Sequence, residues 1–305
     1  MAVAGPISAL RAVDVGVTEM DQALRFYREV WLLEPVAERD GVVFLRGSGR
    51  MHHILSLRVA PRPGLLRVVL EAPDRDAVAA LHRAIGTAGL PLSGAPRGFA
   101  WPGGGHGFGF RDPEGRCFAV ACEVADHAGA LTAPLAPTKL SHVNLNSGDN
   151  ETSFRFLRDV LGFRLSDQTG KHRFLRCNAD HHSLVLGFNA AATLNHIAFE
   201  MADMEALMLG IGRMRDHGYP IEWGPGRHGP GNNVFAYFVG PEELPLEYTA
   251  EMQQVDESYP TGMPDKWKWP PGRVDHWGLT PGPSARVQRT QDLFRFPADG
   301  HLLDL

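Results

Sequence analysis

An internal repeat is the feature that most restricts how this chain of 305 residues can fold. Residues 10–30 align without gaps with residues 140–160, and both segments read as a strand, a polar turn and a helix that carries the motif RF(Y/L)R(E/D)V. Three more pairs follow in the same order along the chain: 44–57 with 174–186, 66–74 with 195–203, and 110–120 with 238–248. Self-similarity of this length predicts two domains of the same fold.

The segments around the repeats divide the chain further. We expect an N-terminal domain at residues 1–128, a linker at 129–138, a C-terminal domain at 139–251 and a tail rich in Pro and Trp at 252–305. Each domain reads as two smaller units of strand, helix and several strands, with joints near residues 61–64 and 189–193. The many turn-forming residues of the tail predict an irregular strap, whose Trp267, Trp269 and Trp277 clamp onto a domain surface.

Composition and charge exclude several classes of function. Apolar residues make up 44% of the chain and charged residues 21%, which is an ordinary globular balance. The net charge of -5 comes without a basic stripe, so we expect no nucleic-acid partner and no membrane partner. No apolar run approaches a membrane span, and the early Arg11 and Asp14 interrupt any signal peptide, so we expect a cytoplasmic protein. Cys117, Cys122 and Cys177 lack disulfide or zinc spacing, which predicts buried free thiols.

Polar side chains on three predicted strands of the second domain indicate a metal site. Period-two alternation turns one imidazole or carboxylate of each strand inward, among residues that otherwise read as strand core. These are His142 on 140–146, His196 on 194–200 and Glu247 on 244–249. Two histidines and one carboxylate match the facial triad that holds a non-haem Fe(II) on one side and leaves its other positions open.

The first copy of the repeat is an internal control for this site. The positions that align with the three candidate ligands are Ala12, Arg67 and Ala119. An inward arginine in place of an imidazole is incompatible with a bound cation there. The sequence therefore predicts one metal ion per chain, in the second half.

Other histidines are harder to interpret from pattern alone. His181 and His182 are expected on an apolar strand, where alternation lets only one of them face inward, and parity does not choose between them. The first copy keeps its own pair, His52 and His53, so a structural role in both copies remains open. His228 lies in a Gly-rich loop, for which a surface histidine is the simpler interpretation.

The motifs LSHVNL, CNADHHSL, LNHIAFE, GRHGPGNNVFAYF and LEY, all between residues 139 and 251, together resemble the type I extradiol dioxygenases of the vicinal oxygen chelate superfamily. This group includes biphenyl-2,3-diol and catechol 2,3-dioxygenases. The resemblance implies an α+β fold of two tandem domains, each built of paired βαβββ modules. It also implies that His142, His196 and Glu247 are the iron ligands.

The resemblance assigns roles to further residues. It implies that His182 is the acid-base, that His228 lies near the substrate oxygens and that Tyr237 donates a hydrogen bond to a catechol oxygen. His181 resembles a neighbouring pocket residue. Some relatives have an Asp after the GRH loop, where this chain has Gly-Asn, so the partner of His228 stays open. We expect substrate-contacting pocket walls to include Asn144 and Phe188.

The activity implied by the resemblance is ring cleavage of a catechol-type aromatic diol, with both atoms of O2 entering the product. The cofactor would be Fe(II), with Mn(II) possible because ligand type does not separate the two ions. Relatives are commonly multimeric, which implies a homo-oligomer. Two alternatives stay open on the same fold: a non-oxidative enzyme such as a glyoxalase-like isomerase, and a metal-free protein that binds small molecules.

Overall fold

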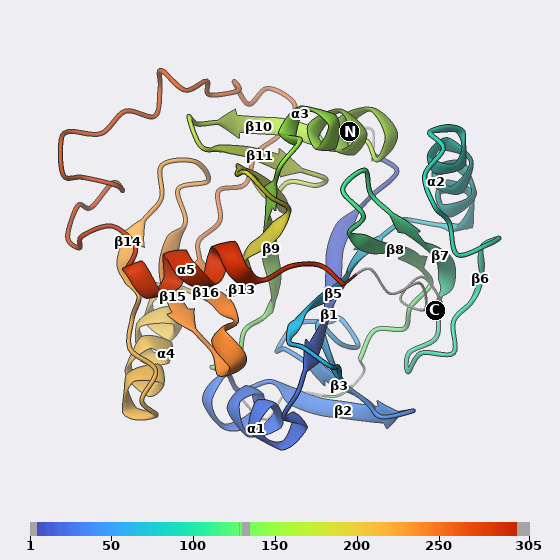
Figure 1. Ribbon diagram of the computed structural model, residues 1–305, viewed down its shortest axis with the longest axis horizontal. Coiled ribbons are helices and arrows are strands. Elements are labelled where there is room, and N and C mark those ends of the chain that lie inside the picture. Colours follow the sequence, from blue (N-terminus) through green and yellow to red (C-terminus); the bar gives the residue numbers. More distant parts are fainter. Residues whose placement is uncertain (1–4, 128, 130–134, 298–305) are drawn as a thin grey trace.

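The computed structural model describes residues 5–127, 129 and 135–297. Residues 130–134 of the predicted linker and residues 298–305 of the predicted tail lie outside the described residues. The described chain forms two sheets of eight strands each, one in each half (Figure 1). This arrangement confirms the predicted α+β fold with two tandem domains.

Each domain contains two βαβββ modules, and equivalent elements have closely similar bounds. The first sheet contains β1 (Ala9–Val17), β2 (Glu34–Arg39), β3 (Val42–Arg46), β4 (Leu55–Val59), β5 (Gly64–Glu71), β6 (Arg97–Gly98), β7 (His106–Arg111) and β8 (Cys117–Cys122). The second contains β9 (Lys139–Ser147), β10 (Arg164–Gln168), β11 (His172–Arg176), β12 (Leu184–Phe188), β13 (Thr193–Glu200), β14 (Trp223–Arg227), β15 (Val234–Val239) and β16 (Pro245–Ala250). The strand orders are β2-β3-β4-β1-β5-β8-β7-β6 and β10-β11-β12-β9-β13-β16-β15-β14.

Four helices connect the strands at equivalent places in the two halves. They are α1 (Met20–Arg25) with the π-helical turn η1 (Phe26–Val30), α2 (Arg75–Thr87), α3 (Asn150–Arg155) with η2 (Phe156–Val160) and α4 (Met204–Asp216). The short η3 (Pro241–Glu243) and α5 (Ala285–Leu293) of the tail have no counterpart in the described part of the first half. The repeat also preserves a helix cap. Asp74 accepts a hydrogen bond from the Ala77 amide at 2.8 Å, and Asp203 accepts one from the Ala206 amide at 2.7 Å. Such a cap stabilises a helix by about 1 kcal/mol.

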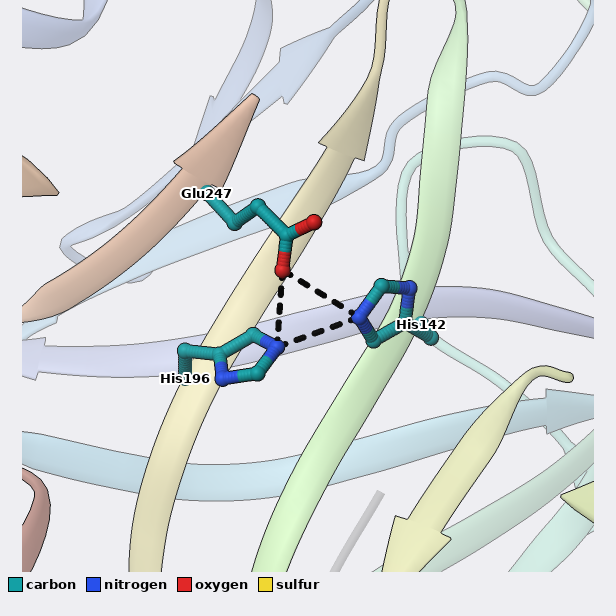
Figure 2. Close-up of side chains that lie close together, drawn as sticks. All are labelled: His142, His196 and Glu247. Atoms are coloured by element: carbon teal, nitrogen blue, oxygen red, sulfur yellow. Dashed lines mark hydrogen bonds and ion pairs between the residues drawn. The ribbon is translucent and has the colours of Figure 1, made fainter. Parts of the chain in front are cut away.

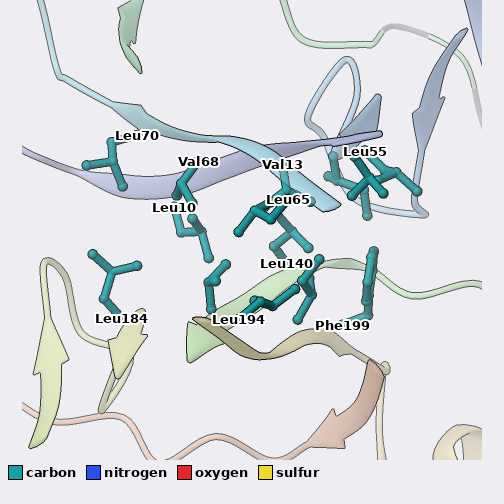
Figure 3. Packing of buried hydrophobic residues seen from close by; sticks show 14 of the residues in the cluster. Leu10, Val13, Leu55, Leu65, Val68, Leu70, Leu140, Leu184, Leu194 and Phe199 are labelled. Atoms are coloured by element: carbon teal, nitrogen blue, oxygen red, sulfur yellow. The ribbon is translucent and has the colours of Figure 1, made fainter. Parts of the chain in front are cut away.

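The two sheets share one hydrophobic core, which lies between them (Figure 3). Leu10 and Leu65 of the first sheet face Leu140 and Leu194 of the second across this core. Val143 of β9 belongs to the same core. Because successive strand side chains point to opposite faces, the polar side chains of β9 are turned to the other face of the second sheet.

Polar contacts also join the two halves. The buried Arg116 guanidinium donates to Asp112 at 2.5 Å within its own domain and to the Ser153 hydroxyl at 3.1 Å in the other. Glu114 accepts hydrogen bonds from the Ser147 hydroxyl at 2.5 Å and the Gly148 amide at 2.6 Å. These contacts fix the second sheet relative to the first.

The tail differs from the predicted irregular strap because it contains α5. This helix packs along β13, and the Leu194 amide donates to the Phe294 carbonyl at 2.7 Å just after it. Before α5 the tail is irregular (Figure 1). There the indoles of Trp267 and Trp269 lie against the α-carbon of Gly229, and the Trp277 ring lies 5.3 Å from the Arg227 guanidinium. The tail therefore covers the loop that carries His228.

The structure also bears on the predictions about the cysteines and about membrane-spanning segments. The three cysteines are buried and unpaired, as expected. In the described part of the chain, none of the helices is both long and apolar enough to cross a membrane.

Candidate metal centre

Strand register brings residues that are far apart in sequence into one row across the second sheet. His142 of β9 is opposite Ala198 of β13, Ala198 is opposite Glu247 of β16, and Glu247 is opposite Tyr237 of β15. Opposite residues share a face of the sheet. The small Ala198 side chain leaves space between the larger groups on either side. His196, two positions along β13, is opposite Asn144 on the same face.

The three predicted ligands meet in this space (Figure 2). The Nε2 atoms of His142 and His196 are 3.1 Å apart. Oε2 of Glu247 lies 2.9 Å from Nε2 of His196 and 3.4 Å from Nε2 of His142. All three side chains are buried, and their donor atoms lie within 4.8 Å of one another.

Neighbouring side chains orient the two imidazoles. Nδ1 of His196 lies 2.7 Å from the side-chain oxygen of Asn195. That oxygen can only accept, so Nδ1 carries the proton and Nε2 presents its lone pair to the site. Nδ1 of His142 has the Ser141 hydroxyl at 3.3 Å.

The protonation states suit a cation. Burial alone would raise the pKa of Glu247, but the adjacent His142 and His196 hold the pKa of this carboxyl below its ordinary range. Burial lowers the pKa of His196. An ionised carboxylate and imidazole lone pairs aimed at one point are three electron-pair donors, which is the chemistry that a divalent metal ion requires. The residues present therefore fit a metal ion.

A third histidine lies beside the ligands without joining them. The ring centroid of His182 is 4.4 Å from that of His142, and the side chain is buried. Burial and the surrounding imidazoles lower the pKa of His182 well below its ordinary value. Gly231, whose φ is 82°, passes so close that a Cβ there would lie 2.9 Å from Cε1 of His182. The glycine in this loop therefore makes room for the imidazole.

His228 and Tyr237 lie on the other side of Glu247. Nε2 of His228 is 3.3 Å from the Tyr237 hydroxyl and 3.9 Å from Oε1 of Glu247. The imidazole stacks on the Phe235 ring at 3.8 Å. Burial lowers the pKa of His228 to about 3 and raises the pKa of Tyr237 well above its ordinary value, so both side chains are neutral. In this chain the partner of His228 is the tyrosine hydroxyl.

Residues 9–119 and 139–248 match the family described as the Glyoxalase/Bleomycin resistance protein/Dioxygenase superfamily. The chain belongs to this superfamily. Relatives of known name include Metapyrocatechase 2 of Cupriavidus necator, 34% identical over 139 residues, and the iron-dependent extradiol dioxygenase of Rhodococcus jostii (strain RHA1), 33% identical over 137 residues. The matched segments cover 45% and 39% of this chain, but only 41% and 46% of those two relatives.

Solved structures of the superfamily include two informative neighbours. The Mn(II)-bound glyoxalase from Novosphingobium aromaticivorans is 35% identical, has a TM-score of 0.84, and is matched over 92% of this chain and 93% of its own. A variant of homoprotocatechuate 2,3-dioxygenase from B. fuscum is 21% identical, has a TM-score of 0.78, and is matched over 91% of this chain and 80% of its own. The second likeness concerns the fold alone.

His181 is expected as a pocket residue, but the structure places it against Asp167 instead of among the three ligands. His181 and His182 precede β12 rather than lie on a strand, which corrects the predicted placement. Their rings are nearly perpendicular, at 90°. His181 is completely buried, and its Nε2 lies 2.9 Å from Oδ2 of Asp167, which also accepts from the Tyr259 hydroxyl at 3.1 Å.

The two expected wall residues have different positions. Asn144 is buried next to His196 on the face of the ligands. Phe188 is at the end of β12, in register with Ser147, and shares a face with core residues of that strand rather than with the ligands. Its side chain is 46% exposed and lies 5.2 Å from the Arg173 guanidinium. Phe188 is therefore on the face of β12 opposite to that of the three ligands.

In the first sheet, the row of residues equivalent to the metal-binding row has no ligand side chains. Ala12 of β1 is opposite Val69, Val69 is opposite Ala119, and Ala119 is opposite Gly109. Arg67 forms an ion pair of 2.9 Å with Asp14. Among the described residues, the group with metal-binding geometry is the one in the second domain.

Sequence patterns did not single out Asp167, Asn195 and Tyr259. Asp167 is charged and completely buried in β10, but burial of a single polar residue is not visible from alternation. The contacts of these three residues with His181 and His196 are what connects them to the site.

Proposed function

We propose that this chain is an Fe(II)-dependent extradiol dioxygenase that cleaves a catechol-type aromatic diol with O2. The observation that carries the proposal is the set of neutral side chains around the triad. A potential proton acceptor, His182, lies beside His142, and a hydrogen-bonded pair, His228 and Tyr237, lies beside Glu247. The names of the relatives from Cupriavidus necator and Rhodococcus jostii support the same reaction class.

We assign the metal to His142, His196 and Glu247. Fe(II) bound there would supply Lewis-acid and one-electron chemistry to a diol and dioxygen. Mn(II) is the alternative ion, because a relative from Geobacillus genomosp. 3, 22% identical over 255 residues, is named a manganese-dependent 2,3-dihydroxybiphenyl 1,2-dioxygenase.

We propose that a chain of hydrogen bonds determines which nitrogen of His182 carries the proton. Nε2 of His181 lies 2.9 Å from Oδ2 of Asp167, and in the proposed arrangement this nitrogen donates to the carboxylate, which leaves Nδ1 of His181 as an acceptor. That atom lies 3.0 Å from Nδ1 of His182, which donates to it in this arrangement. Nε2 of His182 is then left as the basic nitrogen. We propose that it takes a proton from a substrate hydroxyl and later returns it to the developing product.

His228 and Tyr237 are proposed to hold the substrate oxygens. The Tyr237 side chain shares the face and the row of Glu247, so its hydroxyl can donate to an oxygen near the ligands. Because the pKa of this phenol is raised by burial, it keeps its proton and stays a donor. Asn144, on the same face, is proposed to contact the substrate.

A glyoxalase-like isomerase is the second candidate function. It is favoured by one observation, the 35% identity to the Mn(II)-bound glyoxalase over 92% of this chain. The two functions differ in their need for O2. Isomerisation of a hemithioacetal consumes none, whereas ring cleavage consumes O2 and forms a yellow ring-opened product.

A measurement of oxygen uptake distinguishes the dioxygenase from the isomerase. The protein is freed of metal, reconstituted with Fe(II) or Mn(II) without air, and offered a panel of catechols, with a hemithioacetal as the competing substrate. Uptake with yellow colour supports the dioxygenase. Turnover of the hemithioacetal with no catechol-dependent uptake, at one bound metal ion per chain, would establish the isomerase instead.

A further inference from the structure

The first domain has a cavity of about 230 Å3 on the face that corresponds to the metal face of the second domain. Its lining includes Asp14, Ser56 and Arg67, which register brings together: Asp14 of β1 is opposite Ser56 of β4 and Arg67 of β5. In the repeat, Asp14 and Arg67 correspond to Asn144 and His196. The first sheet therefore has a cavity at the position where the second sheet has the metal centre.

The floor of the cavity is polar and fixed. Arg67, whose side chain is 4% exposed, forms an ion pair of 2.9 Å with Asp14. The Ser56 hydroxyl donates to the other oxygen of Asp14 at 2.5 Å. The charges of Arg67 and Asp14 compensate each other. An uncharged part of a ligand can therefore lie on the floor without leaving a buried charge unpaired.

One wall is aromatic. The ring centroids of Phe44 and His53 are 5.0 Å apart, and those of His53 and Trp101 are 6.3 Å apart. Burial lowers the pKa of His53 to about 3, so its imidazole is neutral at physiological pH. Flat faces at such distances can pack against a planar ring of a ligand.

The mouth carries a surplus of positive charge. Arg39 and Asp40 form an ion pair of 3.6 Å with each other. Arg58 is two residues from Ser56 on β4 and lines the same cavity. Its side chain is exposed and makes no ion pair with any of the residues that the structure describes. Arg39 pairs with Asp40 and Arg67 pairs with Asp14, so these four charges balance. Arg58 is the remaining cation of the lining and is available to a ligand.

We propose that this cavity is a second binding site, for a small aromatic carboxylate. The ring lies against Phe44, His53 and Trp101, and the carboxylate pairs with Arg58 at the mouth. The volume is below the range of about 300–1,000 Å3 typical of sites for drug-sized ligands, so the ligand has one ring or two small ones. The site binds and does not catalyse by the proposed metal-dependent route, because Ala12, Arg67 and Ala119 stand at the positions of the three metal ligands, although His53 is retained.

Calorimetric titration of the metal-free, full-length protein with benzoate tests the site. We expect saturable binding of one benzoate per chain, with weaker binding of acetate, which lacks the ring, and of benzyl alcohol, which lacks the charge. Arg58→Gln weakens benzoate binding by about tenfold or more, because a charge-assisted hydrogen bond is lost. Arg62→Gln removes the same charge from another exposed position near the end of β4 and leaves binding unchanged.

Three results would overturn the proposal: no saturable binding, equal loss in both arginine variants, or loss of binding in Glu247→Gln, which would place benzoate in the second domain. Metal-free protein keeps this test separate from the proposed ring cleavage. Arg58→Gln protein reconstituted with Fe(II) should retain wild-type turnover of a catechol.

Discussion

Nε2 of His181 lies 2.9 Å from Oδ2 of Asp167, and both side chains are completely buried. The other nitrogen of the same imidazole lies 3.0 Å from Nδ1 of His182. Asp167 also accepts from the Gly262 amide of the tail at 2.6 Å. A carboxylate on β10, held by the tail, is therefore connected through one imidazole to the side chain beside the metal ligands.

Asp167→Asn tests whether this connection sets the basic nitrogen of His182. An asparagine can donate to His181 and reverse its proton arrangement, so we expect kcat to fall about 10–100-fold with little change in KM. The pH profile of kcat should shift as well, which a loss of stability alone would not cause. Tyr259→Phe removes the other side-chain donor to Asp167 and should leave the profile in place. A wild-type profile in Asp167→Asn would refute the positioning role.

His182→Ala should separate chemistry from binding. We expect kcat to fall by about 10²–10⁴-fold, the usual contribution of a general acid-base. Metal content, measured by mass spectrometry of the digested protein, should stay at the wild-type level because His182 is not one of the three ligands. His217→Gln, an exposed histidine after α4, is the matched control and should retain full activity. Wild-type turnover in His182→Ala would remove its assigned role.

Glu247→Gln should release the metal. The substitution removes the one anionic donor of the site, so we expect bound metal per chain to fall close to zero after dialysis. Glu200→Gln makes the same change at the end of β13, where the carboxylate pairs with Lys139 at 3.3 Å instead. That variant should keep its metal. Equal metal content in the two variants would contradict the ligand assignment.

Acid should loosen the contact between the two domains through Glu114. Burial would raise the pKa of this half-buried carboxyl, but Arg116 and hydrogen bonds from Ser147 and Asp149 outweigh it and lower the pKa below 4.5. A lowered pKa in the folded state stabilises the protein above pH 4.5, and this stabilisation is lost as the pH falls. We expect Tm to fall more steeply between about pH 5 and pH 3 in the wild type than in Glu114→Gln. The same dependence of Tm on pH in the wild type and in Glu114→Gln would contradict this prediction.

The repeat and the strand alternation were enough to predict the two domains and to select His142, His196 and Glu247. Each lies on one of the central strands β9, β13 and β16, and alternation holds over the residues that follow each histidine. Alternation fails at Asn195, where β13 shifts its register against β9 between Leu194 and His196. Leu194 therefore packs in the core, although its parity matches that of His196.

Alternation alone did not place three other residues, for a related reason. His181 and His182 lie between β11 and β12, so no periodicity says which of them faces the ligands, and only the resemblance selected His182. Phe188 is on a strand, but its face follows from the pairing of β12 with β9, which one sequence does not reveal. The contact of Trp269 with Gly229 depends likewise on how the tail folds back over the second domain.

Labelled dioxygen gives the most direct test of the central claim. Protein reconstituted with Fe(II) is incubated with a catechol under heavy-isotope O2, and the yellow product is analysed by mass spectrometry. The proposed reaction predicts that both labelled atoms enter one ring-opened product. A product without label, or O2 uptake that leaves the aromatic ring closed, would contradict extradiol cleavage by this chain.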